Sequence, residues 1–194
     1  MMRYFEGNKM LDKIDLLILD VDGVLTDGRI IYDSRGADVK AFDVQDGQGV
    51  KYWLRAGHEA AILSGRSSRT IRIRARDIGV DVVCEGAKDK LPAFEKLLKR
   101  FGRAADRACC IGDDLPDLPV LARAGFAVAT AGACDEVKRI AHYVTAHAGG
   151  AGAVREAVEL ILKRQGRWDA VLERYSKQLP AGLSASRRPR RSDR

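Results

Sequence analysis

Two aspartates one residue apart, Asp20 and Asp22, stand directly after an apolar run that ends at Leu19. The run has the length and composition of a strand that is buried on both faces. One interpretation is simply a strand followed by an acidic turn, but unpaired carboxylates at the end of a buried strand are energetically expensive. The pattern therefore favours a Mg²⁺ site at the carboxyl end of a parallel strand, where open α/β sheets hold their ligands.

Other reactive side chains follow later apolar runs, and one begins a predicted helix. They are Ser64, Gly65 and Arg66 after residues 59–63, Asp113, Asp114 and Asp117 after residues 108–111, and Lys90 at the helix start. Because the carboxyl ends of parallel strands meet at one edge of a sheet, we expect these groups to converge. Carboxylates, a lysine and a hydroxyl around one cation suit phosphoryl transfer, which mostly needs charge neutralisation and in-line geometry.

The chemistry assigns a role to each group. Asp20 is the nearest to the buried strand and is the predicted nucleophile, forming an aspartyl-phosphate. Asp22 can then serve the leaving oxygen as a general acid and afterwards activate water as a base. Ser64, the amides near it and Lys90 would take the remaining phosphate oxygens.

Apolar runs of strand length alternate with amphipathic segments of helix length, which predicts an α/β fold. The expected strands are 14–19, 59–63, 80–84, 108–111, 126–129 and 142–145, and the expected helices are 46–56, 67–78, 88–101, 116–124, 134–141 and 153–165, with a shorter helix to about 175. This alternation predicts a doubly wound, mostly parallel sheet with right-handed crossovers. Residues 29–42 read as a β-hairpin inserted where a plain βαβ unit would begin its helix, and residues 1–175 as one domain.

Composition excludes several classes of protein. The chain has 194 residues, of which 46% are hydrophobic, so it can bury a sizeable core. No apolar run reaches the roughly 20 residues of a membrane span, and the first residues lack a signal-peptide apolar region, so we expect a cytoplasmic protein without a membrane partner. The four cysteines form no C-x-x-C pair, and Cys109 and Cys110 fall in a predicted buried strand as small apolar residues.

The net charge of +7 raises the possibility of a nucleic-acid partner. Residues 176–194 hold six Lys and Arg residues against Asp193, a surplus of +5 that leaves only +2 for the rest. We expect this basic tail to be disordered. A module that binds nucleic acid through it stays an alternative, but no aromatic residue interleaves its arginines and no folded reader motif is present, which argues against that partner.

Four segments, in order along the chain, resemble the motifs of the haloacid dehalogenase superfamily of phosphatases. The first is 20–28, followed by the Ser64-Gly65-Arg66 turn, then Lys90, then the Gly112-Asp113-Asp114-x-x-Asp117 segment. Four motifs in register are far more specific than any one alone. The resemblance implies a Rossmann-like core and hydrolysis of a phosphate ester through an aspartyl-phosphate.

The short hairpin in place of a cap domain and the segments 40–47 and 149–156 narrow the match. Over roughly residues 10–170 the chain resembles the 3-deoxy-D-manno-octulosonate 8-phosphate phosphatases of lipopolysaccharide precursor synthesis. This resemblance implies a Mg²⁺-dependent homotetramer whose hairpins build an intersubunit barrel. A neighbouring subunit then covers the active site.

The resemblance also implies site residues. Asp20, Asp22 through its backbone oxygen, and Asp113 are the implied metal ligands, with Asp114 and Asp117 as outer partners or further ligands. The implied substrate contacts are Asp22, Asp43, Val44, Gln45, Asp46, Gly47, Lys51, Arg66 and Arg74, where Arg and Lys partners suit a sugar carboxylate. Three positions depart from the family pattern: Asp43 stands where relatives often have Asn, Gln45 where several have Arg, and Ala151 where a basic or polar residue is common. These changes remove positive charge near the sugar. A nine-carbon sugar-acid 9-phosphate therefore stays open as an alternative substrate.

Two further interpretations keep the fold. A phosphoacceptor signalling receiver also combines acidic residues, a hydroxyl and a lysine, but its acidic pair and its phosphorylated aspartate have the opposite arrangement along the chain. A phosphotransferase would pass the phosphoryl group to another sugar, and product analysis with an acceptor alcohol separates it from a hydrolase.

Overall fold

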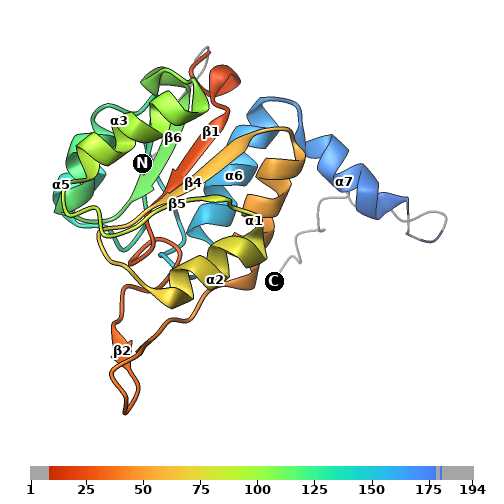
Figure 1. Cartoon of the computed structure of the whole chain (residues 1–194). Helices are drawn as coiled ribbons and strands as arrows, with labels where there is room; N and C mark the ends of the chain where they lie inside the picture. Colours follow the sequence, from red (N-terminus) through yellow and green to blue (C-terminus); the bar gives the residue numbers. More distant parts are fainter. Residues whose placement is uncertain (1–8, 178–179, 181–194) are drawn as a thin grey trace, which may run out of the picture.

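The computed structural model describes residues 9–177 and 180. Its centre is a six-stranded parallel sheet in the order β5-β4-β1-β6-β7-β8 (Figure 1). The strands are β1 Leu16–Leu19, β4 Glu59–Leu63, β5 Val82–Cys84, β6 Ala108–Gly112, β7 Phe126–Ala129 and β8 Tyr143–Val144. The strand order reverses at β1, so the carboxyl ends of β1, β4 and β6 border the switch point where such sheets bind ligands. The doubly wound α/β fold predicted from the sequence is confirmed.

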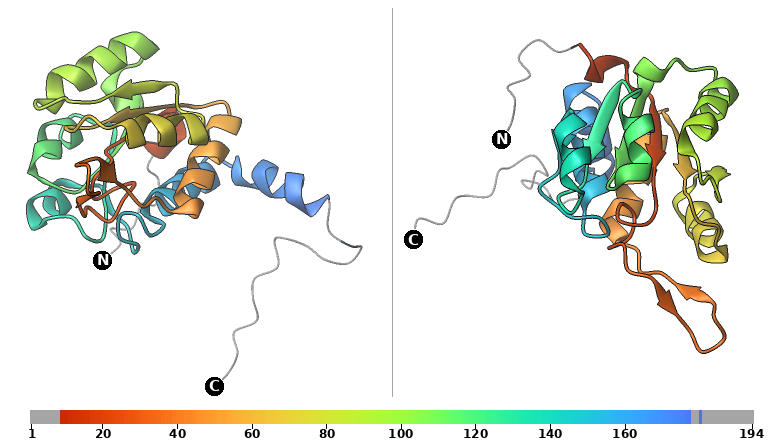
Figure 2. Two further views of the ribbon diagram at one scale, coloured as in Figure 1. Left: turned by 60° about the horizontal axis from the view of Figure 1, so that its bottom comes forward. Right: turned by 90° about the vertical axis from the view of Figure 1, so that its left-hand side faces the viewer.

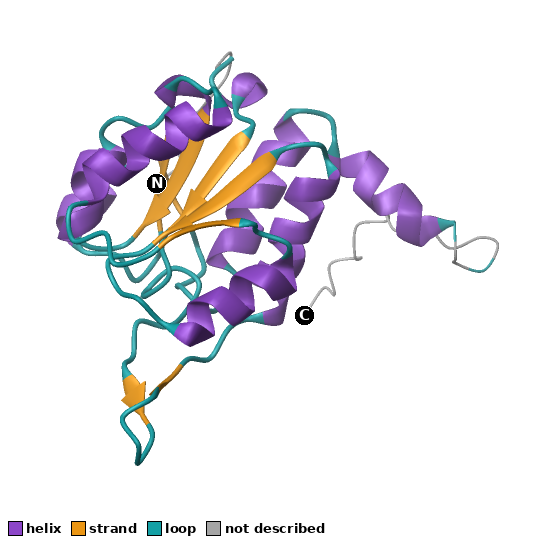
Figure 3. Ribbon diagram, in the orientation of Figure 1, coloured by secondary structure: helices purple, strands orange, loops and turns teal. Residues whose placement is uncertain are grey.

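Helices cover both faces of the sheet (Figures 1 and 3). They are α1 Val44–Arg55, α2 Arg69–Ile78, α3 Lys90–Phe101, α4 Leu118–Leu121, α5 Asp135–Ile140, α6 Ala153–Arg164 and α7 Trp168–Ser176. The apolar cluster on one face holds side chains of α1, α2 and α6, and the cluster on the other face holds those of α3, α4 and α5. The layers follow from the crossovers, because each parallel connection must return over one face.

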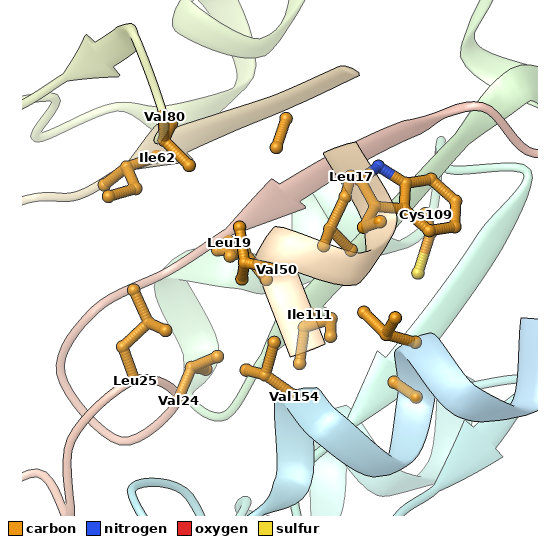
Figure 4. Packing of buried hydrophobic residues seen from close by; sticks show 14 of the residues in the cluster. Leu17, Leu19, Val24, Leu25, Val50, Ile62, Val80, Cys109, Ile111 and Val154 are labelled. Carbon is orange, nitrogen blue, oxygen red and sulfur yellow. The ribbon is translucent and has the colours of Figure 1, made fainter. Parts of the chain in front are cut away.

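The central strand is buried on both sides. Leu17 and Leu19 of β1 point into the cluster that also contains Val50 and Val154 (Figure 4). Leu16 and Ile18 point to the opposite face, and all four side chains are at most 2% exposed. Burying a leucine contributes about 2 kcal/mol, so β1 is held rigidly and its carboxyl end is a fixed platform.

A short hairpin projects from the body between β1 and α1 (Figures 1 and 2). It pairs β2 Ile31–Tyr32 with β3 Asp38–Val39 in antiparallel register, with Ile31 opposite Val39. The predicted hairpin is present, but its ladder is shorter than the expected 29–42. Ile31, Tyr32 and Val39 are 48%, 59% and 48% exposed, so this insertion presents apolar surface to its surroundings.

Helix boundaries differ from expectation where capping or proline intervenes. Helix α1 begins at Val44 rather than residue 46, because the Asp43 side chain caps it by accepting a hydrogen bond from the Asp46 amide. The expected helix 116–124 is a 3₁₀ turn, Leu115–Asp117, followed by the short α4, since Pro116 and Pro119 limit a continuous helix.

Two predictions concern the ends and the membrane. The basic tail predicted for residues 176–194 lies almost wholly outside the described residues. Among the residues that are described, no helix is long and apolar enough to cross a bilayer.

All four cysteines are free, and Cys109 and Cys110 are buried in β6.

Candidate active site

Reactive side chains from three adjacent strand ends and one helix start meet at the switch point. Asp20 follows β1, Ser64 follows β4 and Asp113 follows β6, while Lys90 is the first residue of α3. Lys90 Nζ lies 3.0 Å from Asp20 Oδ1. Of the groups expected to converge, Asp20 and Lys90 are therefore in direct contact.

Three carboxylates form the centre of the site. One oxygen from each of Asp20, Asp113 and Asp117 lies within 4.8 Å of the other two. A cluster of oxygen donors at this density has the chemistry that a hard divalent cation such as Mg²⁺ requires. The donor set therefore fits the metal expected from the sequence.

The site raises the proton affinity of two of these carboxyls. Burial, reinforced by Asp117 and opposed by Lys90, raises the pKa of Asp20 to about 6. Burial, reinforced by Asp20 and Asp117, raises the pKa of Asp113 to about 7. Burial by itself would lower the pKa of Lys90, but Asp20 and Asp117 outweigh it and raise that pKa. The protein alone thus undercompensates the negative charge, as expected of a site built for a cation.

These shifts predict how the stability of the metal-free protein depends on pH. The folded pKa of Asp113 is raised above its unfolded value, so its contribution to stability is present below about pH 4 and is lost as pH rises through about 7. In urea unfolding with a chelator, we expect Asp113→Asn to be more stable than the wild type at pH 8, with the gain shrinking toward pH 5. A gain independent of pH would contradict this origin.

Asp117 lies deeper in the site than its sequence position suggested. It is buried, and its Oδ1 accepts a hydrogen bond of 2.6 Å from Lys90 Nζ. Its Oδ2 accepts a hydrogen bond from the Asp113 amide at 3.0 Å. Asp117 therefore orients both Lys90 and the Asp113 backbone, whereas the neighbouring Asp114 is exposed and does not join the carboxylate cluster.

The Asp22 carboxylate contacts the base of the hairpin. Its Oδ1 forms an ion pair with Lys40, and its Oδ2 lies 3.7 Å from Arg66 Nε. Asp22 Oδ2 is buried and has no hydrogen-bond partner among the described residues. The two aspartates of the first motif thus face different surroundings, which suits two different roles.

The loop that follows Asp22 depends on glycine for its conformation. Gly23 has φ +84°, and a Cβ there would lie 1.9 Å from Asp113 Oδ2. Thr26 Oγ1 accepts from the Gly23 and Gly28 amides and closes the turn. A Cβ on Gly149 would lie 1.9 Å from the Gly23 carbonyl oxygen, so residues 149–152, the Gly-rich stretch, pack directly against this loop.

The turn after β4 holds the predicted phosphate contacts. Ser64 is buried, its amide bonds to the Cys84 carbonyl, and its Oγ accepts from the Arg66 amide. Arg66 is half exposed, and its Nη2 donates to Tyr32 Oη at 3.1 Å. Gly65, between them in the sequence, is exposed.

The segment predicted to contact the substrate divides into exposed and buried parts. Val44 and Gln45 are exposed and Lys51 is half-buried on α1. Asp46 is fully buried, and its carboxylate accepts from the amides of Gly152 and Arg155 at 3.2 and 2.9 Å. Asp46 therefore fixes the end of the Gly-rich stretch where it leads into α6.

Arg74 has a similar internal position. Its Nη2 donates to the Asp43 carbonyl at 2.6 Å, and its guanidinium lies over the Phe42 ring at 5.3 Å. A Cβ on Gly47 would lie 2.4 Å from Arg74 Nη2, so that glycine admits the arginine. These contacts hold the segment that leads from the hairpin into α1.

Sequence reasoning missed the contact of Lys40 with Asp22. The two residues are 18 positions apart, and the contact exists only because the hairpin folds back toward the first motif. A lysine directly after a hairpin strand was the only available signal, and it does not reveal the partner.

Carboxylates, a buried lysine and a serine turn at the switch point of a parallel sheet have the chemistry of a phosphoryl-transfer enzyme. A family model described as haloacid dehalogenase-like hydrolase matches residues 80–157. The 3-deoxy-D-manno-octulosonate 8-phosphate phosphatase KdsC of Escherichia coli strain K12 is 42% identical over 158 residues, which cover 81% of this chain and 84% of that enzyme.

Solved structures agree with this comparison. The 3-deoxy-D-manno-octulosonate 8-phosphate phosphatase of Moraxella catarrhalis, crystallised with magnesium, phosphate and KDO, is 41% identical with a TM-score of 0.84, covering 88% of this chain and 99% of that one. The cobalt-bound Haemophilus influenzae phosphatase is 41% identical with a TM-score of 0.79, over 81% and 92% of the chains. The chain belongs to the family of 3-deoxy-D-manno-octulosonate 8-phosphate phosphatases, and the resemblance inferred from its motifs is confirmed.

Proposed function

We propose that this protein is a Mg²⁺-dependent phosphatase that releases phosphate from 3-deoxy-D-manno-octulosonate 8-phosphate, in lipopolysaccharide precursor synthesis. The observation that carries the proposal is the cluster of Asp20, Asp113 and Asp117 beside Lys90, in a chain that is 41% identical to an enzyme crystallised with magnesium, phosphate and KDO. Asp20, Asp113 and the Asp22 backbone oxygen would hold the ion. When bound, the ion neutralises charge on the phosphoryl group and on the carboxylates around it.

The chain's own residues carry the two chemical steps. Asp20 attacks phosphorus while the bond to the sugar oxygen breaks, and Asp22 gives a proton to that oxygen. Water then attacks the aspartyl-phosphate, Asp22 takes its proton, and Asp20 is released. Ser64, Gly65 and Lys90 hold the non-bridging oxygens through both steps.

The sugar-binding part of the proposal concerns the mouth of the site. Val44, Gln45 and Arg66 are exposed. Arg66, which lies beside Asp22, would offer its guanidinium to the sugar carboxylate. The start of α1 is held by contacts of Asp43, Arg74 and Asp46, and Gly47 leaves room for Arg74. Lys51 lies further along α1. Gln45 removes a positive charge relative to the family pattern, so a nine-carbon sugar-acid 9-phosphate is the second candidate substrate.

Phosphate release with Mg²⁺ tests the function across both sugar-acid phosphates and simple alkyl phosphates. We expect the eight-carbon 8-phosphate to have the highest kcat/KM and a chelator to abolish turnover. A higher value for the nine-carbon ester would transfer the assignment to that substrate. Product analysis with added alcohol separates hydrolysis from phosphoryl transfer to an acceptor.

We also propose that the protein is a homotetramer in which the hairpin contacts neighbouring subunits and a neighbour covers the site. Ile31 and Val39 face each other on the hairpin and are each 48% exposed, a pattern typical of a buried interface. The predicted cytoplasmic location and the lack of a nucleic-acid partner stay predictions.

The oligomer proposal predicts the behaviour of a hairpin variant. We expect Ile31→Glu combined with Val39→Lys to give smaller particles by light scattering, because charged side chains would be desolvated in the interface. We expect kcat/KM to fall because the assembly is lost, while the far-ultraviolet circular dichroism spectrum stays unchanged. A wild-type protein that is monomeric and fully active would contradict cover by a neighbour.

A further inference from the structure

Lys40 is a buried cation at the point where the hairpin returns to the body. Its side chain is 1% exposed, and its ammonium contacts Asp22 Oδ1 and lies 3.8 Å from Asp38 Oδ2. Lysine is almost never fully buried unless it is paired, because its ammonium is strongly hydrated in water. The position of Lys40 therefore depends on Asp22, and the position of Asp22 depends on Lys40.

The base of the hairpin is anchored to the start of α2. Ser68 Oγ donates to Asp38 Oδ1 at 2.9 Å, and Thr70 Oγ1 donates to the Asp38 carbonyl at 3.3 Å. These contacts come from the N-terminus of α2, so they hold the residues around Lys40 independently of the hairpin tip. Lys40 thus reaches Asp22 from a fixed point.

Within the described part of the chain, no other contact fixes the Asp22 carboxylate so firmly. Arg66 lies 3.7 Å from Asp22 Oδ2, but its side chain is 47% exposed and also donates to Tyr32. Asp22 Oδ2 is buried without a hydrogen-bond partner among the described residues. Lys40 therefore holds the Asp22 carboxylate through Oδ1, which fixes its orientation.

We propose that Lys40 is a positioning residue that orients Asp22 as the general acid. The inference rests on the proposed function, in which Asp22 protonates the leaving oxygen. In that step the Asp20–phosphorus bond forms, the bond from phosphorus to the sugar oxygen breaks, and a proton moves from the Asp22 carboxyl group to that oxygen. Lys40 keeps its own proton throughout and acts only through Asp22.

The experiment compares two leaving groups in the Lys40→Met variant. A sugar alkoxide needs a proton as it leaves, whereas p-nitrophenolate leaves without one. The quantity measured is kcat/KM, which reports steps up to formation of the aspartyl-phosphate. We expect a loss of about 30-fold or more with the sugar-acid phosphate and less than about threefold with p-nitrophenyl phosphate, since general acid catalysis contributes about 10²–10⁴-fold.

A double-mutant comparison tests whether Lys40 acts through Asp22. We expect Lys40→Met combined with Asp22→Asn to be no slower on the sugar-acid phosphate than Asp22→Asn alone, within about threefold. Lys40→Gln, which keeps a hydrogen-bond donor, should retain part of the leaving-group selectivity and serves if the methionine variant does not fold. Lys13→Met is the control for loss of a lysine elsewhere, because it removes an exposed lysine–aspartate pair with Asp106.

The outcomes separate this inference from the proposed function. Equal losses of kcat/KM on both substrates, or no loss on either, would overturn the role of Lys40. Normal activity of Asp22→Asn on the sugar-acid phosphate would instead remove Asp22 as the acid and contradict the proposed mechanism. A selective loss in Lys40→Met together with non-additivity supports the inference.

Discussion

Replacement of Asp20 by asparagine should reduce kcat for the sugar-acid phosphate by at least about 10⁴-fold, the scale on which nucleophiles contribute to catalysis. The variant keeps the size of the side chain but removes the anionic oxygen that attacks phosphorus. Asp20 Oδ1 lies 3.0 Å from Lys90 Nζ, so the lost oxygen is also part of the buried charge balance. Phosphate release at saturating Mg²⁺ and substrate measures the effect.

Two controls make the Asp20→Asn result specific to chemistry. The folded state should persist, because burial already penalises the Asp20 carboxylate and raises its pKa to about 6. We therefore expect thermal unfolding of Asp20→Asn to be cooperative, with a midpoint temperature at or above that of the wild type. Asp106→Asn, at the amino-terminal edge of β6, should keep normal turnover. Normal turnover in Asp20→Asn would show that another group is the nucleophile.

The part of the site that could be predicted from the sequence depends on strand ends. An apolar run followed by Asp20 specifies both a buried strand and the edge at which its last residue emerges. The same reasoning locates Ser64 and Asp113, because parallel strands share one direction. These positions needed no knowledge of side-chain contacts, since the backbone topology alone brings them together.

The parts that could not be predicted depend on contacts between side chains far apart in the sequence. Asp46 stands in a segment that resembles a substrate-binding loop. Its carboxylate nevertheless lies at the N-terminus of α6, where it accepts hydrogen bonds from the amides of Gly152 and Arg155. Lys40 reaches Asp22 across a hairpin whose fold sets the distance. Neither pairing has a period or a spacing that a sequence pattern could reveal.

The short α4 illustrates a local limit of the same kind. Apolar residues between 116 and 124 have helical spacing, but Pro116 and Pro119 divide the segment into a 3₁₀ turn and four helical residues. The turn places Asp117 where its Oδ2 accepts the Asp113 amide. Because this turn sets the position of Asp117, the irregular backbone helps to build the site.

Lys90→Met should have the second large effect, on both activity and stability. Lys90 is the cation that contacts both Asp20 and Asp117, at 3.0 and 2.6 Å, and all three side chains are at most 10% exposed. We expect kcat/KM to fall about 10³-fold, because the phosphoryl oxygens lose a charged donor in a buried site. Removing one partner of a buried ion pair also costs about 3–5 kcal/mol, which urea unfolding in a chelator would measure.

A second substitution separates the two consequences of losing Lys90. In Lys90→Met combined with Asp117→Asn, the number of uncompensated carboxylates falls by one, so we expect much of the lost stability to return. Activity should stay low, because the neutral amide introduced by Asp117→Asn cannot supply the cation that Lys90 offers to phosphate. If the double variant regained activity along with stability, Lys90 would act only as a counterion to Asp117. If the double variant is slower than Asp117→Asn alone, Lys90 acts on the phosphoryl group and not only as the counterion of Asp117.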